Sequence, residues 1–368
     1  MTGADPRPAI RSCLVVGTGL IGTSVALALR AAGVEVHLTD RDPEAVRRAA
    51  QLGAGTADPA ASQVDVAVVA VAPSATAEVV TGLVAGNSAA TVVDTAGVKE
   101  QVLGAVRQAL GETPHFVGTH PMAGRERSGP GAARADLFQG RPWVLVPDGA
   151  DDRSLRRARA LVELCGGVPL EMGAGEHDAA VALVSHVPQV AASLVAARLA
   201  EGADRALPIT GQGLRDVTRV AASDPDLWVD ILAANPSPVA HALTELRADL
   251  DAVVHALHEV HDDPEWARTA LREVLVRGNA GRARLPGKHG GRSTTYAVVP
   301  VVVPDRPGEL ARLVNDVGAS GVNIEDLRIE HSPGQPVGLV ELAVAPASAA
   351  AVARTLGGLG WVVHPGEA

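Results

Sequence analysis

The sequence predicts an α/β protein of 368 residues in three parts. In the first part, short valine-rich runs alternate with helical runs, which is typical of a doubly wound α/β domain. In the second, strand-like runs are absent and long alanine- and leucine-rich helices follow one another. In the third, strand-like and helical runs are mixed again. We place the dinucleotide-binding α/β domain at 1–173, an all-helical domain at 174–280, a linker at 281–295 and a small α+β domain at 296–368.

A glycine-rich turn follows the first predicted strand, residues 13–16, and leads into a helical run over residues 23–32. Its pattern is Gly-x-Gly-x-x-Gly, in which the first glycine permits a tight turn, the second a close approach to a pyrophosphate, and the third helix–strand packing. The helix then directs unpaired N–H groups and the positive end of its dipole at phosphates. We therefore predict a Rossmann-type dinucleotide site that contains Gly17, Thr18, Gly19, Leu20, Ile21 and Gly22.

An acid, Asp40, follows the second predicted strand, residues 34–39. It lies eighteen positions after Gly22, close to the spacing at which dinucleotide-binding domains place an acidic residue. A carboxylate there accepts hydrogen bonds from the ribose hydroxyls of NAD and repels the additional phosphate of NADP. We therefore predict NAD as the cofactor. Arg41 keeps NADP open, since a neighbouring cation softens that repulsion, and a glycine turn without any ligand is the structural alternative.

The other elements of the first domain follow in order. We predict a helix over residues 43–52 and strands over residues 64–71, 91–94, 116–119, 143–146 and 167–170. The third strand is nearly all apolar, as a strand covered on both faces is. Because ligands bind at the carboxyl ends of strands in open α/β sheets, the loops that begin at Asp94 and His120 are the candidates for chemistry.

His120 follows its strand directly and is expected to face the nicotinamide. A neutral imidazole there accepts the proton of a substrate hydroxyl while hydride leaves the same carbon. A structural histidine bonded to the backbone is the alternative.

Composition argues against several classes of protein. A net charge of −10 and an aromatic content of 2% argue against a nucleic-acid partner. The two cysteines, Cys13 and Cys165, lie far apart in the sequence, which suits a reducing compartment and predicts neither a disulfide framework nor a metal site. Residues 1–11 hold no apolar segment of signal-peptide length, so we expect a cytoplasmic protein.

The helical domain carries wide apolar faces, above all over residues 181–199. A lone bundle of this size exposes less apolar surface, so we predict a homodimer through this domain. Residues 179–197 carry no formal charge, which makes a membrane span the alternative. Because this run contains His186, Pro188 and Gln189, we instead predict a helix buried in a protein core and no membrane partner.

The third domain follows a stretch, residues 277–295, that holds five glycines and five Lys or Arg but no acid. This composition favours a soluble tether, with a basic patch for an anionic ligand as the alternative. Apolar runs then predict strands at 296–303, 322–330, 337–344 and 361–364 and helices within 306–319 and 347–359. The order βαββαβ is ferredoxin-like.

Taken together, these motifs resemble the prephenate/arogenate dehydrogenase family of tyrosine biosynthesis. The resemblance lies in the glycine loop, in Asp-x-x-x-Val-Lys from Asp94, in His-Pro-Met-Ala-Gly-x-Glu-x-x-Gly from His120, and in residues 176–178, 185–188 and 213–219. The third domain resembles an ACT domain through residues 304–310 and 322–324. Such domains usually bind amino acids and regulate the enzyme that carries them.

The resemblance implies that hydride passes from C4 of a cyclohexadienol to NAD and that loss of CO2 aromatises the ring. The product is 4-hydroxyphenylpyruvate from prephenate or tyrosine from arogenate. His120 matches the catalytic histidine, and Arg219 matches the arginine that holds a substrate carboxylate, a role that suits a guanidinium. Asp216, three positions earlier, would orient Arg219, with a surface salt bridge as the alternative. The matches to pocket positions are Glu126, His177, His186 and Trp228.

Two positions depart from the family pattern. Gly97 stands where the family often has a serine that is hydrogen-bonded to the catalytic histidine, and Gln189 stands where it often has a second histidine. One lost hydrogen bond costs about 0.5–1.5 kcal/mol, whereas acid–base help from a histidine is worth about 10²–10⁴ in rate. We therefore expect Gly97 to change the rate modestly while the mechanism through His120 is kept. We expect Gln189 to change the preference between the pyruvyl side chain of prephenate and the alanyl side chain of arogenate.

Spacing adds one structural expectation. His177 and His186 lie nine positions apart, which places them on opposite faces of a straight helix. A helix start or a kink must separate them if both face one pocket.

Two other functions stay open: a dehydrogenase for an amino-substituted prephenate, and a non-catalytic sensor of NAD and an amino acid. In the third domain, we expect Gly308 to admit the carboxylate of an effector at the helix N-terminus and Asn323 to take its amino group. Tyrosine or phenylalanine is the predicted effector. A dimerisation module without a ligand is the alternative.

Overall fold

The computed structural model describes residues 10–60, 62–124, 129–202, 204–285, 296–331 and 336–364. The chain forms two compact units, one made of residues 1–197 and 218–245 and the other of residues 198–217 and 246–368. The helices that the sequence assigns to one domain are thus divided between the two units of a single chain.

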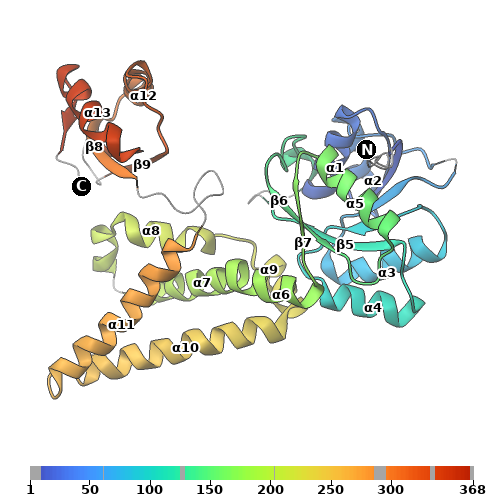
Figure 1. Cartoon of the computed structure of the whole chain (residues 1–368), viewed down its shortest axis with the longest axis horizontal. Helices are drawn as coiled ribbons and strands as arrows, with labels where there is room; N and C mark the ends of the chain where they lie inside the picture. Colours follow the sequence, from blue (N-terminus) through green and yellow to red (C-terminus); the bar gives the residue numbers. More distant parts are fainter. Residues whose placement is uncertain are drawn as a thin grey trace, which may run out of the picture. The chain divides into compact units, whose positions relative to one another are not determined.

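The first unit is built on a seven-stranded sheet in the order β2-β1-β3-β4-β5-β6-β7 (Figure 1). Its strands are β1 Ser12–Val16, β2 Glu35–Thr39, β3 Val66–Val69, β4 Val92–Asp94, β5 Phe116–Pro121, β6 Pro142–Val146 and β7 Val168–Glu171. Its helices are α1 Leu20–Ala31, α2 Pro43–Gln51, α3 Pro73–Ala85, α4 Glu100–Leu110 and α5 Asp152–Leu164. The predicted α/β domain is confirmed.

The strand order reverses between β1 and β3, since β2 lies on the other side of β1. Strands β1 to β5 run parallel. All four residues of β3 are buried, as expected for a strand covered on both faces. The carboxyl ends of β1 and β3 therefore form the kind of switch point at which open α/β sheets bind ligands.

Strand β6 runs antiparallel to β5 and parallel to β7. The connection from β5 to β6 holds only a short 3-10 turn, η1 Pro130–Ala132, among its described residues, and no crossover helix of the kind that joins parallel strands. As a consequence, the carboxyl end of β5 and the amino end of β6 lie at the same edge of the sheet.

The helical segment continues after β7. Its elements are α6 Ala174–Val181, the π-helical turn η2 Ala182–His186, α7 Val187–Ala200, η3 Asp204–Ile209, α8 Gln212–Thr218, η4 Arg219–Ala221, α9 Pro225–Ala234, α10 Pro236–His258 and α11 Pro264–Ala283. The predicted helical character of this segment is confirmed.

Helix α11 corrects the predicted start of the linker at residue 281, because the helix continues to Ala283. Gly278 and Gly281 each weaken a helix by about 1 kcal/mol relative to alanine but do not end it. Arg277 offsets part of this cost, since its Nη2 lies 2.6 Å from Oδ1 of Asp249 on α10. Residues 286–295 of the predicted linker lie outside the described residues.

Residues Ala174–Ala200 form a helical stretch long and apolar enough to cross a membrane, but only 28% of its apolar window is buried in the single chain. The predicted burial in a core is therefore not achieved within one chain, because Leu183, Val184 and Leu194 are each at least 60% exposed. By contrast, His177 and His186 of the same stretch are buried. The stretch thus buries its two histidines and leaves several large apolar side chains uncovered.

The third domain has the βαββαβ order that the sequence predicts. Its elements are β8 Ala297–Pro304, α12 Glu309–Ala319, β9 Asp326–His331, β10 Val337–Val344, α13 Pro346–Gly358 and β11 Val362–Val363. The antiparallel sheet has the order β11-β8-β10-β9, and the two helices pack on it (Figure 1). Leu313 of α12 and Leu356 of α13 are fully buried and belong to the same apolar core as Leu342 of β10.

Candidate active site

The glycine loop has the geometry that its predicted role requires. Gly17 has φ +97°, and a Cβ there would lie 2.3 Å from the Ala70 carbonyl oxygen. A Cβ on Gly22 would lie 1.9 Å from the Gly17 oxygen, so neither position accepts a side chain. A Cβ on Gly19 would meet no atom within 4 Å. Gly19 is the N-cap of α1 and makes no side-chain cap hydrogen bond, so the space in front of the helix is open to an anion.

A cavity of about 580 Å³ lies beside this loop, at the carboxyl ends of β1, β2 and β3. Asp40 lines it, and its Oδ2 accepts hydrogen bonds from the amide of Thr18 at 2.6 Å and from the Thr18 hydroxyl at 3.1 Å. Burial alone would raise the pKa of Asp40, but hydrogen bonds from Asp42 and Thr18 outweigh it and lower the pKa. An ionised carboxylate therefore stands at the position predicted for ribose recognition, next to Arg41.

A buried ion pair joins the loop after β4 to the end of β5. Lys99 and Asp94 are both fully buried and contact each other directly. Lys99 Nζ also donates to the Thr119 carbonyl oxygen at 2.6 Å, and the Thr119 amide donates to Asp94 Oδ1 at 3.0 Å. Burial lowers the pKa of Lys99, and the carboxylate of Asp94 counteracts this shift. These contacts fix the backbone immediately before His120.

Two histidines and a carboxylate follow one another at this edge of the sheet. His120 Nδ1 lies 2.9 Å from His177 Nε2, and His177 Nδ1 lies 2.7 Å from Asp178 Oδ1. Asp178 also accepts the amide hydrogens of Lys99 at 2.8 Å and Glu100 at 2.9 Å. The first turn of α4 thus holds the carboxylate in place.

The surroundings of His120 keep its imidazole neutral. Burial lowers the pKa of His120 well below its usual range, and the nearby His177 and Lys99 lower it further. His120 is therefore a neutral imidazole at physiological pH, as a general base must be before the reaction.

A π-helical turn, Ala182–His186, separates His177 from His186 and supplies the predicted break between them. Pro188 accounts for it, because proline has no amide hydrogen for an α-helical bond to residue 184. Both histidines are buried. Asn235 Nδ2 donates to the Asp178 carbonyl oxygen at 2.8 Å and lies 3.3 Å from His186 Nδ1. The ring of Trp228 lies edge-on to His186 at 6.1 Å.

Gly97 faces the other side of the His120 ring. A Cβ at position 97 would lie 3.6 Å from His120 Nε2, which is ordinary van der Waals contact. A serine hydroxyl there would be close to Nε2. In this chain that space is open, and Nε2 is the ring nitrogen that faces it.

The remaining predicted site residues are less closely connected to this cluster. Gln189 is buried on α7, whereas Arg219 is exposed. Helix α8 ends at Thr218 and Arg219 begins η4, so the predicted common helix face of Asp216 and Arg219 is interrupted. Asp216 Oδ1 accepts a hydrogen bond from Gln212 Nε2 at 2.9 Å, and its role in orienting Arg219 stays a prediction. The predicted pocket residue Glu126 lies outside the described residues.

Comparison with known proteins places this arrangement in a family. Residues 25–170 match the model of the prephenate dehydrogenase nucleotide-binding domain, and residues 173–274 match that of the prephenate dehydrogenase dimerization domain. The chain belongs to the prephenate dehydrogenase family. The resemblance drawn from the motifs is thereby confirmed, and the chain is assigned to a family of oxidoreductases.

Relatives of this family align with most of the chain. NovF of Streptomyces niveus, named as a probable prephenate dehydrogenase, is 42% identical over 92% of this chain and 96% of its own length. The prephenate dehydrogenase of Bacillus subtilis is 29% identical over 86% of this chain and 87% of its own length. The crystal structure of the A. aeolicus enzyme in complex with hydroxyphenyl propionate and NAD+ aligns with a TM-score of 0.64 at 28% identity, over 74% of this chain and 98% of that chain.

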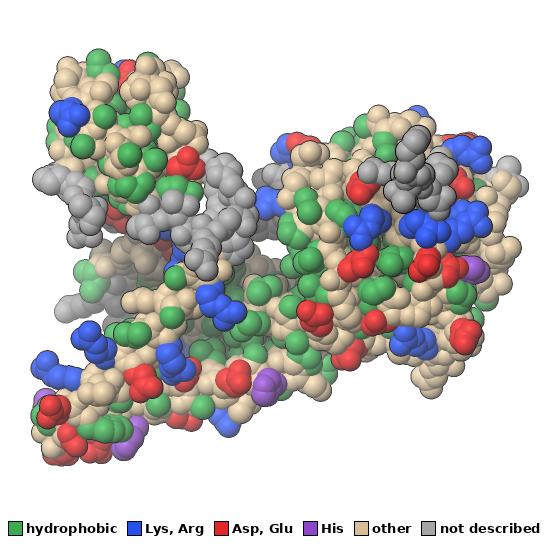
Figure 2. All heavy atoms as spheres, in the orientation of Figure 1, with side chains coloured by type: hydrophobic (Ala, Val, Ile, Leu, Met, Phe, Trp, Pro, Cys, Tyr) green, Lys and Arg blue, Asp and Glu red, His purple; other side chains and the backbone are tan. Residues whose placement is uncertain are grey.

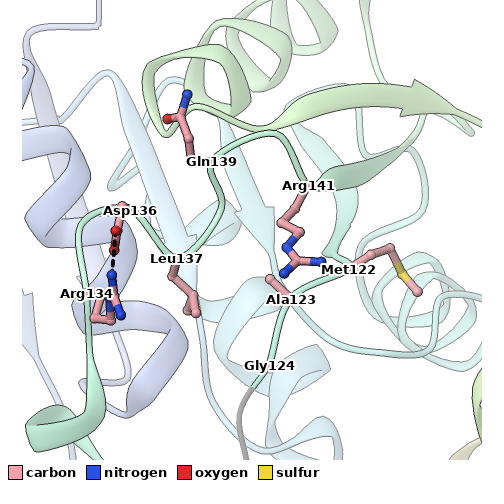
Figure 3. Close-up of a pocket in the computed structure, with 8 residues that line it drawn as sticks. All are labelled: Met122, Ala123, Gly124, Arg134, Asp136, Leu137, Gln139 and Arg141. Atoms are coloured by element: carbon pink, nitrogen blue, oxygen red, sulfur yellow. Dashed lines mark hydrogen bonds and ion pairs between the residues drawn. The ribbon is translucent and has the colours of Figure 1, made fainter. Parts of the chain in front are cut away.

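A second cavity, of about 410 Å³, lies where β5 ends and β6 begins. Figure 3 shows the guanidinium of Arg141 near Met122 and Ala123, and Arg134 paired with Asp136. The Arg134 amide donates to Ser24 Oγ of α1 at 3.1 Å, which fastens this part of the connection to the helix after the glycine loop.

Sequence reasoning missed three residues of the cluster. Lys99 and Asp178 stand inside motifs that it singled out, but their partners lie elsewhere in the chain and no spacing rule indicates them. Asn235 lies between α9 and α10, and no local pattern marks it. In each case the role comes from a tertiary contact.

Proposed function

We propose that this chain oxidises prephenate, arogenate or both with NAD, and that loss of CO2 from C1 then aromatises the ring. One observation carries the proposal: His120 stands at the carboxyl end of β5 with Nδ1 engaged by His177 and Nε2 facing the open space at Gly97. A base at that place, in a chain whose relatives are named prephenate dehydrogenases, supports removal of a proton from a ring hydroxyl.

NAD is the cofactor of this proposal, because the residues present fit it. The open space at Gly19 suits a pyrophosphate, and the ionised carboxylate of Asp40 suits ribose hydroxyls. The A. aeolicus relative is described in complex with NAD+. When bound, NAD supplies the hydride acceptor.

The residues of the chain then account for the proton. His120 Nε2 removes the proton of the C4 hydroxyl as hydride leaves C4. Decarboxylation leaves its electron pair on the ring, so the C4 oxygen becomes a phenolate. The proton on His120 returns to that oxygen, and the proton balance closes without a further acid.

The test is a substrate panel. Prephenate, arogenate and an amino-substituted prephenate are each mixed with the full chain and either NAD or NADP, and the absorbance of the reduced nicotinamide is followed. We expect turnover of prephenate or arogenate with NAD. Fastest turnover of the amino analogue would favour the second candidate, which the open space at Gly97 makes worth testing. Binding of NAD without turnover of any ring would contradict the proposal and favour a sensor.

Arg219 provides a prediction on substrate binding. Arg219→Gln is expected to raise KM for prephenate about 10- to 100-fold, because a charge-assisted, two-pronged contact to a carboxylate is worth about 1.5–3 kcal/mol. Arg219→Lys keeps the positive charge but cannot make the two-pronged contact, so its KM should lie between those of the native chain and Arg219→Gln. Arg215→Gln is a matched control, since Arg215 is also exposed and lies on α8. An unchanged KM in Arg219→Gln would refute the role.

A homodimer is part of the proposal. The uncovered side chains of Leu183, Val184 and Leu194 support it, as does the match to a dimerization domain. Figure 2 shows hydrophobic side chains at the surface of α10 and α11 among charged ones. Light scattering of the purified chain should give twice the chain mass of 37.5 kDa. A mass of 37.5 kDa at micromolar concentration would contradict it.

We further propose that the third domain is an ACT-like effector domain for tyrosine or phenylalanine. Gly308 has φ +90° and caps α12 without a side-chain hydrogen bond, which leaves the helix N-terminus open to a carboxylate. Asn323 Nδ2 donates to Glu325 Oε1 at 2.7 Å, so its Oδ1 is the atom that would accept from an amino group. The substrate panel is repeated in the presence of tyrosine or phenylalanine, and binding of each amino acid is measured by calorimetry. If neither amino acid changes the rate or gives a heat of binding, the domain is a dimerisation module without a ligand.

The domain limits and the cellular compartment are proposals as well. We keep 1–173 and 296–368 as functional domains and extend the helical domain from 174–280 to 174–283, because α11 ends at Ala283. The cytoplasm is the proposed compartment. Cys13 and Cys165 are both buried, and burial raises the pKa of Cys165 to about 12, which suits thiols that stay reduced.

A further inference from the structure

We propose that Asp178 and His177 form a relay that fixes the tautomer of His120, so that Nδ1 carries the hydrogen and Nε2 presents its lone pair to the substrate. His177 and Asp178 are positioning residues in this scheme, since they act through His120. The effect of this relay on catalysis rests on the proposed function, whereas the tautomer of His120 does not depend on it.

The relay begins at a carboxylate that can only accept hydrogen bonds. Asp178 receives two backbone amides, from Lys99 and Glu100, one on each oxygen. Burial alone would raise the pKa of Asp178, but the hydrogen bonds from His177 and from these amides outweigh it and lower the pKa. Asp178 is therefore ionised. Because an ionised carboxylate has no hydrogen to give, the 2.7 Å contact to His177 Nδ1 requires an N–H on that nitrogen.

The second step follows from the chemistry of imidazole. A neutral imidazole has one N–H and one lone pair, so His177 Nε2 is an acceptor once Nδ1 carries the hydrogen. His120 Nδ1 lies 2.9 Å from it and must donate, since two facing lone pairs would repel. His120 Nε2 is then left without a hydrogen. This is the nitrogen that faces the open space at Gly97.

The surroundings of His120 favour its neutral form, because burial and the nearby His177 and Lys99 all lower its pKa. Lys99 is paired with Asp94, and burial also lowers the pKa of His186. A proton that arrives on His120 during the reaction turns its Nδ1–H into a stronger donor. The negative charge of Asp178 then stabilises the imidazolium through His177.

Nitrogen NMR tests the tautomer without any turnover. The full chain is labelled with 15N-histidine, and His120→Asn assigns the signals of that ring. We expect an unprotonated Nε2 and a protonated Nδ1 in the native chain, with and without NAD. In His177→Phe we expect the form protonated at Nε2 to appear, because the acceptor for Nδ1–H is lost. A native ring protonated at Nε2, or an unchanged spectrum in His177→Phe, would overturn the proposal.

Kinetics then test the consequence. His177→Phe should lower kcat for prephenate about 10- to 100-fold, the effect of losing one charge-assisted hydrogen bond, with KM and the Kd for NAD nearly unchanged. His177→Gln should recover part of the rate, since its amide oxygen can accept from Nδ1–H. It also serves if the phenylalanine variant fails to fold. His115→Phe is the control, because it removes an exposed imidazole paired with Asp151.

The outcomes separate the two proposals. A native chain that oxidises prephenate while His177→Phe and His177→Gln keep its full kcat would overturn the relay alone. A native chain that oxidises no ring substrate would overturn the proposed function, and the NMR result would still decide the tautomer.

Discussion

Replacing His120 with asparagine is expected to lower kcat for prephenate about 10²- to 10⁴-fold, the usual worth of a general base. Asparagine can accept or donate a hydrogen bond toward His177 but cannot take up a proton at physiological pH. The proposed NAD site and the proposed carboxylate contact at Arg219 do not involve this side chain. The Kd for NAD should therefore stay nearly constant, and initial rates together with NAD titrations measure both quantities.

The matched control for this variant is His115→Asn. His115 lies in the same domain, is 57% exposed at its side chain and pairs with Asp151 at the surface. Its replacement should leave kcat unchanged. If His120→Asn kept the native kcat, His120 would not be the base and the proposed mechanism would fail at its central step.

The sequence predicted the parts of the fold that local sterics and periodicity determine. The roles of Gly17 and Gly22 can be predicted from the sequence, because the turn and the close packing at those positions admit no Cβ. The valine-rich run of β3 is readable because both its faces are covered. His120 could be placed because it comes at the end of a predicted strand, although β5 in fact includes it, and the carboxyl ends of strands are where such sheets bind ligands.

Other features depend on contacts between distant segments. Strand β6 runs antiparallel to β5, and the described residues of the connection between them hold no crossover helix, which the strand pattern itself does not reveal. The role of Asp178 depends on the amides of Lys99 and Glu100, nearly eighty positions earlier. The extension of α11 past Gly281 is accompanied by an ion pair between Arg277 and Asp249, which offsets part of the cost of the two glycines and which no local pattern reveals.

The second large effect concerns stability and not catalysis. Lys99→Met is expected to lower the free energy of unfolding by about 3–5 kcal/mol, the usual result of removing one partner of a buried ion pair. The loss arises chiefly because the fully buried carboxylate of Asp94 would lose its counter-ion. The Thr119 carbonyl oxygen would lose a donor as well. Urea unfolding at a fixed protein concentration measures the change, since dimer formation makes stability depend on concentration.

A double variant separates this explanation from a simple packing defect. In Lys99→Met with Asp94→Leu, no buried charge is left alone, so much of the lost stability should return. Glu44→Gln, which breaks an exposed ion pair with Arg47, should change the midpoint little. The opposite result, a double variant less stable than Lys99→Met, would contradict this explanation. The hydrogen bonds that Asp94 accepts from the amides of Thr119 and Ala96 would then contribute more stability than an unpaired carboxylate costs. Position 120 would then be held mainly by those bonds, and the ion pair would serve only to neutralise the carboxylate that makes them.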